Sequence, residues 1–236
     1  MKPKSKPRTP ILQAHSNRSI IKGEVALKKE GLLTRLQALA QLPSAGPSPT
    51  FAYPQVACAL LLIGDEKFVG RTQLSKTLGL GEGTTRTIIR HLTLAKLVKS
   101  SKQGCTLTPK GLLLYKRLRS RLSRTVVVNA RQLSLDSAST AVLVRKSAYK
   151  VKQGIEQRDA AVRSGATGAC TILVKRGRLV MPQVSDDWKL DLDDPLAQEL
   201  VNAFQPKHED VIIIASANDK SVADYAAIAA GLMLLG

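Results

Sequence analysis

Arg86 and Arg90 lie four residues apart in the segment TTRTIIRH, a spacing that places both guanidinium groups on one face of a helix. Arginine can donate paired hydrogen bonds to a guanine edge, whereas threonine hydroxyls suit phosphate oxygens. We expect Thr84, Thr87 and His91 to share this outward face, because the apolar residues between them must face a core. The pattern predicts a surface that binds duplex DNA.

A helix-turn-helix is the element that would present these side chains. The segment Arg71–Leu78 is predicted to be a short first helix that ends at Gly79, and Arg71 joins the predicted DNA-binding residues. A second helix is predicted to begin at Thr84, a favourable N-cap residue, and to run to about Lys96. Its apolar stripe consists of Ile88, Ile89, Leu92 and Ala95.

A β-hairpin wing is predicted after the second helix, from strands at 97–101 and 105–108. The turn between them places Lys102 at the tip, where it would contact the DNA backbone or minor groove. Helices at 54–63 and 109–122 complete a winged helix-turn-helix, with residues 64–67 as a loop. The residues of the last helix expected to point inward are Leu112, Leu113, Tyr115, Leu118 and Leu122.

The net charge of +18 is unevenly distributed along the chain. Residues 54–124 contain 14 Lys and Arg against 3 acidic residues, and residues 1–53 contain 9 against 2. Residues 125–236 contain 13 of each kind. A basic half joined to a neutral half predicts a polyanion partner for the first half and a different role for the second.

Composition and pattern divide the chain into four segments. Residues 1–22 are rich in Lys, Pro and Ser and are predicted to form a disordered basic tail, either a solubilising extension or an arm that adds phosphate contacts. Residues 23–49 are predicted to form an amphipathic helix and a Pro-rich linker. The winged helix-turn-helix takes residues 50–124, and a dimerisation or ligand-sensing domain takes residues 125–236.

The second half is predicted to be a smaller α/β-type sandwich, which makes the fold class of the whole chain α+β. Its expected strands are 125–128, 140–144, 169–174, 178–181 and 209–215. Its expected helices are 152–164, 195–204 and a last helix that Ser221 would cap and that would end at Leu235.

Two polar clusters in this half are candidates for a small-molecule pocket. One lies on the predicted helix 152–164, and the other follows the last strand, at the kind of strand end where ligands often bind. The alternative is an Asx turn with an N-cap, beside an ordinary surface helix face. The candidate residues are Gln157, Arg158, Asp159, Ser216, Asn218 and Asp219.

Motifs for catalysis and metal binding do not occur in the sequence. No Gly-Lys-Ser/Thr follows the glycine-rich run LGLGEGT, and neither GxSxG nor HExxH is found. The three cysteines are far apart, which favours a reducing compartment over a disulfide framework or a zinc site. The acidic run 186–194 lacks the glycine and final Glu of a calcium loop. We predict no catalytic residue, metal, cofactor or membrane span.

The segments LSKTLGLGEGTTRTIIRHLTLAKLV and LTPKG resemble the winged helix-turn-helix of archaeal transcriptional regulators. The segments GIEQRDAAVRSGATGACTILVKRGRLVMP and DVIIIASANDKSVADYAAIAAGLMLL resemble the uncharacterised domain that follows such a winged helix in archaeal proteins. The resemblance covers about residues 53–236. It implies that Arg86, Thr87 and Arg90 lie on the recognition helix and Lys102 on the wing, and that Thr85 replaces a customary apolar residue.

The function that these patterns predict is that of a cytoplasmic DNA-binding transcriptional regulator. It would act as a homodimer on double-stranded DNA, with a small-molecule effector for the second half. Two alternatives remain open. In the first alternative, the winged helix contacts protein or RNA. In the second, the second half of the chain is an enzyme, and the sequence does not indicate its reaction.

Overall fold

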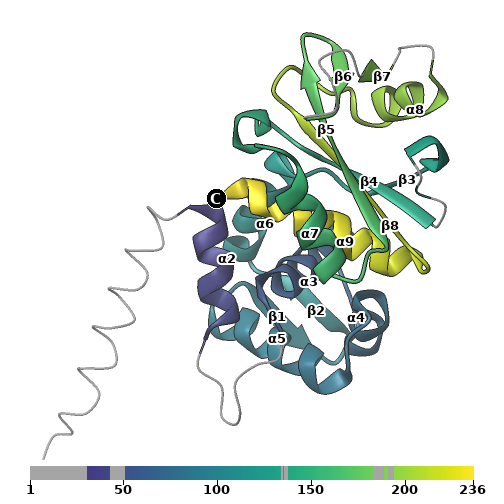
Figure 1. Ribbon diagram of the computed structural model, residues 1–236. Coiled ribbons are helices and arrows are strands. Elements are labelled where there is room, and N and C mark those ends of the chain that lie inside the picture. Colours follow the sequence, from purple (N-terminus) through teal and green to yellow (C-terminus); the bar gives the residue numbers. More distant parts are fainter. Residues whose placement is uncertain (1–30, 43–50, 134, 136–137, 183–188, 191–193) are drawn as a thin grey trace, which may run out of the picture. The chain divides into compact units, whose positions relative to one another are not determined.

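The computed structural model describes residues 31–42, 51–133, 135, 138–182, 189–190 and 194–236. The predicted basic tail and most of the Pro-rich linker and acidic run lie outside these residues. The described part is α+β, with a winged helix-turn-helix followed by a sheet domain (Figure 1). The fold class predicted from the sequence is therefore confirmed.

The winged helix-turn-helix is built as its sequence pattern predicts, with shifts at the element ends. Helix α4 and its left-handed stop at Gly79, where φ is 61°, are as predicted. Helix α3 extends beyond the predicted end at Ile63, so the expected loop at 64–66 is its last turn. The elements are α3 (Tyr53–Glu66), α4 (Arg71–Leu78), α5 (Glu82–Leu94), β1 (Val98–Ser101), β2 (Gly104–Leu107) and α6 (Pro109–Arg121).

The start of α6 is fixed by a cap and a close backbone approach. The side chain of Thr108 accepts a hydrogen bond from the Gly111 amide at 3.0 Å, which satisfies a donor of the first turn. Gly111 lies against the Leu97 carbonyl, so that a Cβ placed there would be 1.9 Å from its oxygen. This contact rotates α6 so that Leu114 and Leu118 are buried, while Leu112 and Leu113 are exposed. The predicted inward orientation of these last two residues is wrong.

Helix α2 (Leu32–Ala40) packs on the winged helix beside α3 and α5. It lies within the region where an amphipathic helix was expected, and Leu32, Leu36 and Leu39 are buried. Among the described residues, α2 therefore packs against the buried side of α5.

A sheet of six strands in the described residues forms the second half, in the order β3-β4-β8-β5-β6-β7, with all neighbours antiparallel. The central strand β8 pairs along its length with β4 and β5. Its apolar residues Val211–Ile214 are buried, and they lie in the strand predicted at 209–215. The strands are β3 (Val126–Val128), β4 (Ala138–Val144), β5 (Gly168–Lys175), β6 (Arg178–Val180), β7 (Lys189–Leu190) and β8 (Val211–Ala217).

Helices cover both faces of this sheet (Figure 1). Helices α7 (Ile155–Arg163) and α9 (Lys220–Leu232) pack on one face, and α8 (Pro195–Phe204) packs on the other. Alternate residues of β8 enter different cores: Ile213 faces the side of α9, whereas Ile212 and Ile214 face the side of α8. Asp219 caps α9 by accepting from the Ser221 amide at 2.7 Å, so the predicted cap at Ser221 is wrong by two residues.

One apolar core joins the two halves. Helix α9 lies between the sheet and the winged-helix helices, and it contacts α3 and α4 as well as β4 and β8 (Figure 1). Leu36 of α2, Leu60 of α3, Val142 of β4 and Ala227 of α9 belong to the same buried cluster. The four-segment division predicted from composition stays a prediction.

Candidate nucleic-acid interface

The turn before α5 is held by backbone and side-chain hydrogen bonds. The Gly79 amide donates to the Lys76 carbonyl at 3.2 Å, and the Ser75 hydroxyl donates to the Leu80 carbonyl at 2.5 Å. Gly81 is the N-cap of α5, so the helix begins two residues before the predicted cap Thr84. The earlier start places Glu82 and Gly83 in the first turn of α5.

Arg86 and Arg90 are exposed on α5, as predicted, while Ile88, Ile89 and Leu92 are buried on the opposite side. The apolar stripe thus fixes the rotation of α5, and the two guanidinium groups are left one turn apart at the surface. This arrangement presents ten N–H donors, about five from each Arg, to whatever approaches α5.

The threonines in the first half of α5 differ in exposure. Thr84 and Thr87 are half-buried, and the Thr87 hydroxyl donates to the Gly83 carbonyl at 3.1 Å. Thr85 is buried, and its Oγ1 has no hydrogen-bond partner among the described residues. Thr85 therefore occupies a core position, in agreement with the apolar residue that the resemblance implies there.

His91 lies in the core, and its predicted outward orientation is wrong. Its side chain is 0% exposed, and its Nδ1 is 3.0 Å from the Leu39 carbonyl of α2. The imidazole also meets the Phe51 ring edge-on, with 5.4 Å between the ring centroids. His91 thus holds α5 against α2 and cannot contact DNA without leaving the core.

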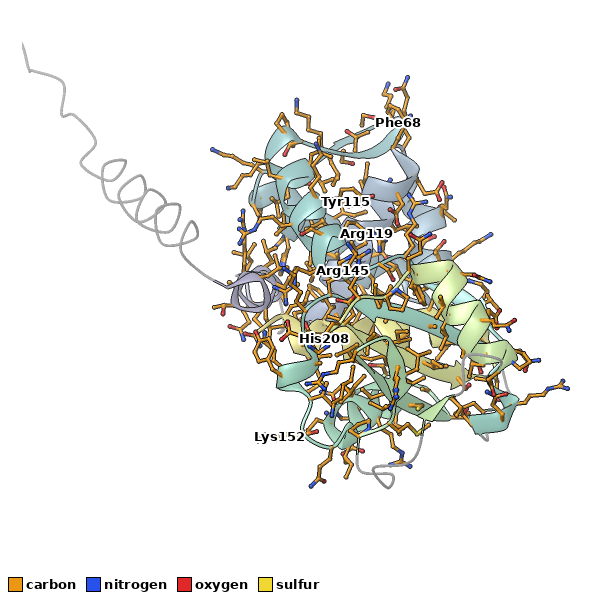
Figure 2. The ribbon with its side chains drawn as sticks, turned by 90° about the horizontal axis from the view of Figure 1, so that it is seen from above. Phe68, Tyr115, Arg119, Arg145, Lys152 and His208 are labelled. Atoms are coloured by element: carbon orange, nitrogen blue, oxygen red, sulfur yellow. The ribbon has the colours of Figure 1, made fainter. Side chains whose placement is uncertain are left out.

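The wing presents Lys102 at its exposed tip, with the exposed Lys99 on β1. A short bridge fixes the hairpin to the chain before α4: the Cys105 amide donates to the Val69 carbonyl at 2.9 Å, and the Val69 amide donates back at 3.2 Å. The neighbouring Phe68 is exposed (Figure 2). The wing is therefore positioned by the strand-like segment that leads into the helix-turn-helix.

A small hollow of about 100 Å³ lies where the two helices of the helix-turn-helix begin. Arg71 and Thr72 of α4 line it together with Glu82 and Arg86 of α5. The sequence pattern identified both arginines but missed Glu82, because a helix start at Thr84 left Glu82 in a turn. An acidic residue stabilises the first turn of a helix, so Glu82 itself was a signal in the sequence that the helix begins before Thr84.

The first polar cluster of the second half lies on α7. Gln157 is buried, and its Oε1 has no partner among the described residues. Arg158 is exposed and Asp159 is half-buried, and the two lie 3.7 Å apart in a surface ion pair. This pair is accessible to a ligand but forms no enclosed site by itself.

The second cluster follows β8. Ser216 is buried and hydrogen-bonded to Ser139 of β4, whereas Asn218 is exposed. Hydrogen bonds from the hydroxyl and amide of Ser221 lower the pKa of Asp219 below its ordinary value. Asp219 and Ser216 therefore have structural partners, and the predicted pocket at these residues stays a prediction.

Within the described residues, no group of three or more His, Cys, Asp or Glu side chains is arranged to hold a metal ion. The same part of the chain has no helix that is long and apolar enough to cross a membrane.

Two regions of the chain match known families. Residues 56–112 match a family described as the PH0730-like N-terminal domain, and residues 135–234 match a domain of unknown function, DUF4443. The two matches fall on the winged helix-turn-helix and the sheet domain, respectively.

Among solved structures, the hypothetical protein PH0730 from Pyrococcus horikoshii OT3 is similar to this chain at 28% identity and a TM-score of 0.65. The match covers 78% of this chain and 92% of that chain, so both parts of the fold are shared. The archaeal source of this relative agrees with the resemblance noted in the sequence.

A second solved structure, the MarR family protein Rv2887 from Mycobacterium tuberculosis, is 19% identical to this chain. That match covers 43% of this chain and 70% of that chain, with a TM-score of 0.28. A search of curated proteins returned no match.

Proposed function

We propose that this protein is a DNA-binding transcriptional regulator whose helix α5 reads duplex DNA. The observation that carries the proposal is the division of α5 into a buried apolar side and an exposed side with Arg86 and Arg90. A helix presented in this way, with donors one turn apart, fits the major groove, where Arg pairs with guanine.

Charge supports the same proposal. The winged-helix region holds 14 Lys and Arg against 3 acidic residues, and exposed cations lie on α4, α5 and the wing. Arg71 at the start of α4 lies near Arg86 of α5, Lys102 is exposed at the wing tip, and both would contact phosphates. Such contacts release counterions, so binding would weaken steeply with salt.

The second half would serve dimerisation or effector sensing. A homodimer would present two copies of α5 to a two-fold symmetric site, and the protein would work in the cytoplasm, beside the DNA. We assign no catalytic reaction to the chain. Light scattering on the full chain tests the dimer, and a monomer at high protein concentration would remove that part of the proposal.

Titration of mixed-sequence duplex DNA with the full chain across a salt series tests the DNA contact. We expect Arg86→Ala/Arg90→Ala to lower the affinity roughly ten- to hundredfold, because each arginine would lose its contact with a base edge. The matched control is Arg176→Ala/Arg178→Ala, which removes two exposed arginines near the β5–β6 turn.

The control separates a specific contact from net charge. If both pairs of substitutions weaken binding equally, affinity follows total charge and α5 has no special role. The same titration with duplex RNA of equal length tests the RNA alternative. Absence of DNA binding even at low salt would overturn the proposal.

A further inference from the structure

A cavity of about 290 Å³ lies where the winged helix meets the sheet domain. Its lining comes from α3, α4 and α9 and from the chain around the end of α6, so both halves of the protein contribute to it. The volume is close to the lower end of the range for small-molecule sites, about 300 Å³. A ligand of modest size would therefore touch both halves at once.

One part of the lining is apolar. Leu61 and Leu62 of α3, Leu78 of α4 and Ile228 of α9 line the cavity, and Cys58 lies beside them. Burial raises the pKa of the Cys58 thiol to about 12, so this side chain is a neutral, apolar contact at physiological pH. The apolar part would accept a hydrocarbon group.

The other part is charged and held by a network on α3 and α6. Asp65 accepts from the Tyr115 hydroxyl at 2.7 Å and from Arg119 at 2.5 Å, and Arg124 lies 3.2 Å from the same carboxylate. Figure 2 shows Tyr115 and Arg119 on α6. Arg119 also donates to the Ser123 carbonyl at 2.6 Å. The guanidinium of Arg119 is therefore fixed at the edge of the cavity.

Two residues that line the cavity have a buried polar atom without a hydrogen-bond partner in the described structure. These atoms are Nε of Arg119, a donor, and Oδ1 of Asp224, an acceptor. The other oxygen of Asp224 pairs with Lys220 at 2.6 Å. Buried polar atoms are normally paired, so an unpaired donor and an unpaired acceptor on two lining residues point to a missing partner. Both atoms are closed to solvent here, so a ligand would supply these partners after a small shift of the lining side chains.

We propose that this cavity binds a small zwitterion with an apolar body, such as an α-amino acid with an aliphatic or aromatic side chain. Its ammonium would donate to Asp224, its carboxylate would accept from Arg119, and its side chain would lie against Leu61, Leu62 and Ile228. Opposite charges on the ligand match the opposite charges of the two residues, and the apolar body matches the rest of the lining.

The position of the cavity connects it to the proposed DNA contact. Thr77 and Leu78, the last residues of the first helix of the helix-turn-helix, line it together with α9. Helix α4 packs on α5, so a ligand that displaces the end of α4 changes the position of the recognition helix. The regulatory part of this inference rests on the proposed function, whereas the binding part does not.

Calorimetric titration of the DNA-free full chain tests the binding part. The probes are L-leucine, L-valine and L-phenylalanine, with 4-methylpentanoic acid and 3-methylbutylamine as analogues that carry one charge each. We expect at least one of the amino acids to bind and both analogues to bind at least tenfold more weakly. Equal binding of an analogue would overturn the zwitterion assignment, and no binding of any amino acid would overturn the proposal.

Two variants locate the site. Asp224→Asn keeps the size of the side chain and removes its charge, and Thr77→Trp adds a ring at an exposed residue of the lining. We expect each to weaken binding at least tenfold. The control is Asp159→Asn on α7, which removes a carboxylate away from the cavity. Binding that is unchanged in both cavity variants, or lost only in the control, would overturn the proposal.

The regulatory part is tested by repeating the DNA titration with the bound amino acid at saturation. We expect a change in DNA affinity of at least threefold, which Asp224→Asn abolishes. An amino acid that binds without changing DNA affinity would overturn regulation but leave the site. Absence of DNA binding without any ligand would overturn the proposed function instead, so the two failures are distinct.

Discussion

The Nδ1 atom of His91 lies 3.0 Å from the Leu39 carbonyl oxygen, and this contact ties α5 to α2. A carbonyl oxygen only accepts, so Nδ1 carries the proton and donates it to Leu39. The rear of α5 is therefore anchored by a helix that precedes the winged-helix sequence. This anchor explains why a histidine in a basic segment belongs to the core.

Replacement of His91 by Ala removes that anchor. We expect His91→Ala to lower the free energy of unfolding by about 2–4 kcal/mol, because it leaves a cavity beside Phe51 and an unpaired carbonyl at Leu39. Urea denaturation followed by circular dichroism measures the change. The exposed neighbour Arg90 is the control: Arg90→Ala should change stability by less than about 0.5 kcal/mol. Equal losses at the two positions would contradict the buried role of His91.

Two glycines of the winged helix should respond in opposite directions to the same substitution. Gly111→Ala would place a Cβ 1.9 Å from the Leu97 carbonyl oxygen, so that α6 must separate from the start of the wing. We expect a loss of about 3 kcal/mol or more. Gly83→Ala on α5 meets nothing within 4 Å and should stabilise the helix by up to about 1 kcal/mol. Thermal unfolding of both variants measures these changes. A Gly111→Ala protein as stable as the wild type would contradict the contact between Gly111 and the Leu97 carbonyl.

The Asp65–Arg119 pair joins the end of α3 to α6, and both side chains are less than a fifth exposed. Asp65→Ala leaves Arg119 charged without its partner, and we expect a loss of about 3 kcal/mol. Tyr115→Phe removes one hydrogen bond from a neutral donor to the same carboxylate and should cost about 1.5–3 kcal/mol. A double-mutant cycle between positions 65 and 119 measures the coupling. Additive losses would show that the pair contributes nothing as a unit.

The thiols of Cys58, Cys105 and Cys170 all have pKa values raised by burial, to about 12 for Cys58 and Cys170. A thiol whose pKa is raised on folding contributes stability that is complete below its unfolded pKa, near 9, and that falls as pH rises toward 12. We expect the native protein to react slowly with a thiol reagent at pH 8, and the unfolded chain to react fast at all three cysteines.

Comparison with Cys58→Ala isolates the contribution of one thiol. The difference in unfolding free energy between the wild-type chain and this variant should be constant from pH 7 to about 9 and should shrink above it. Rapid labelling of native Cys58 at pH 8, or a difference that does not vary with pH up to 11, would contradict its burial.

The sequence was sufficient for the helices and the central strand, because their patterns are strong and local. Helices α4 and α8 have their predicted bounds, and the apolar residues Val211–Ile214 lie in the central strand β8. Element ends were less certain where two signals competed. Thr84 is a better N-cap residue than Gly81, yet the helix begins after Gly81, since the chain can add a turn there without strain.

The orientation of side chains depended on partners that are distant in sequence. His91 is buried because α2 supplies an acceptor 52 residues away. Three consecutive leucines at 112–114 do not show which of them faces inward, and the contact of Gly111 with Leu97 decides in favour of Leu114. The cavity between the halves was not predictable for the same reason: its lining comes from segments between residues 58 and 228.

The apolar core that runs from α2 through α9 to the sheet has a mechanical consequence. A winged helix connected by a flexible hinge could swing freely to find its site, but here such a swing would expose the leucines of α3 and the alanines of α9 to water. Under the proposed function, a signal from the sheet domain would therefore reach α5 as a small shift of packed helices. The protein would then act as a rigid body, in which a displacement of about 1 Å at α4 would change how Arg86 and Arg90 meet a DNA groove.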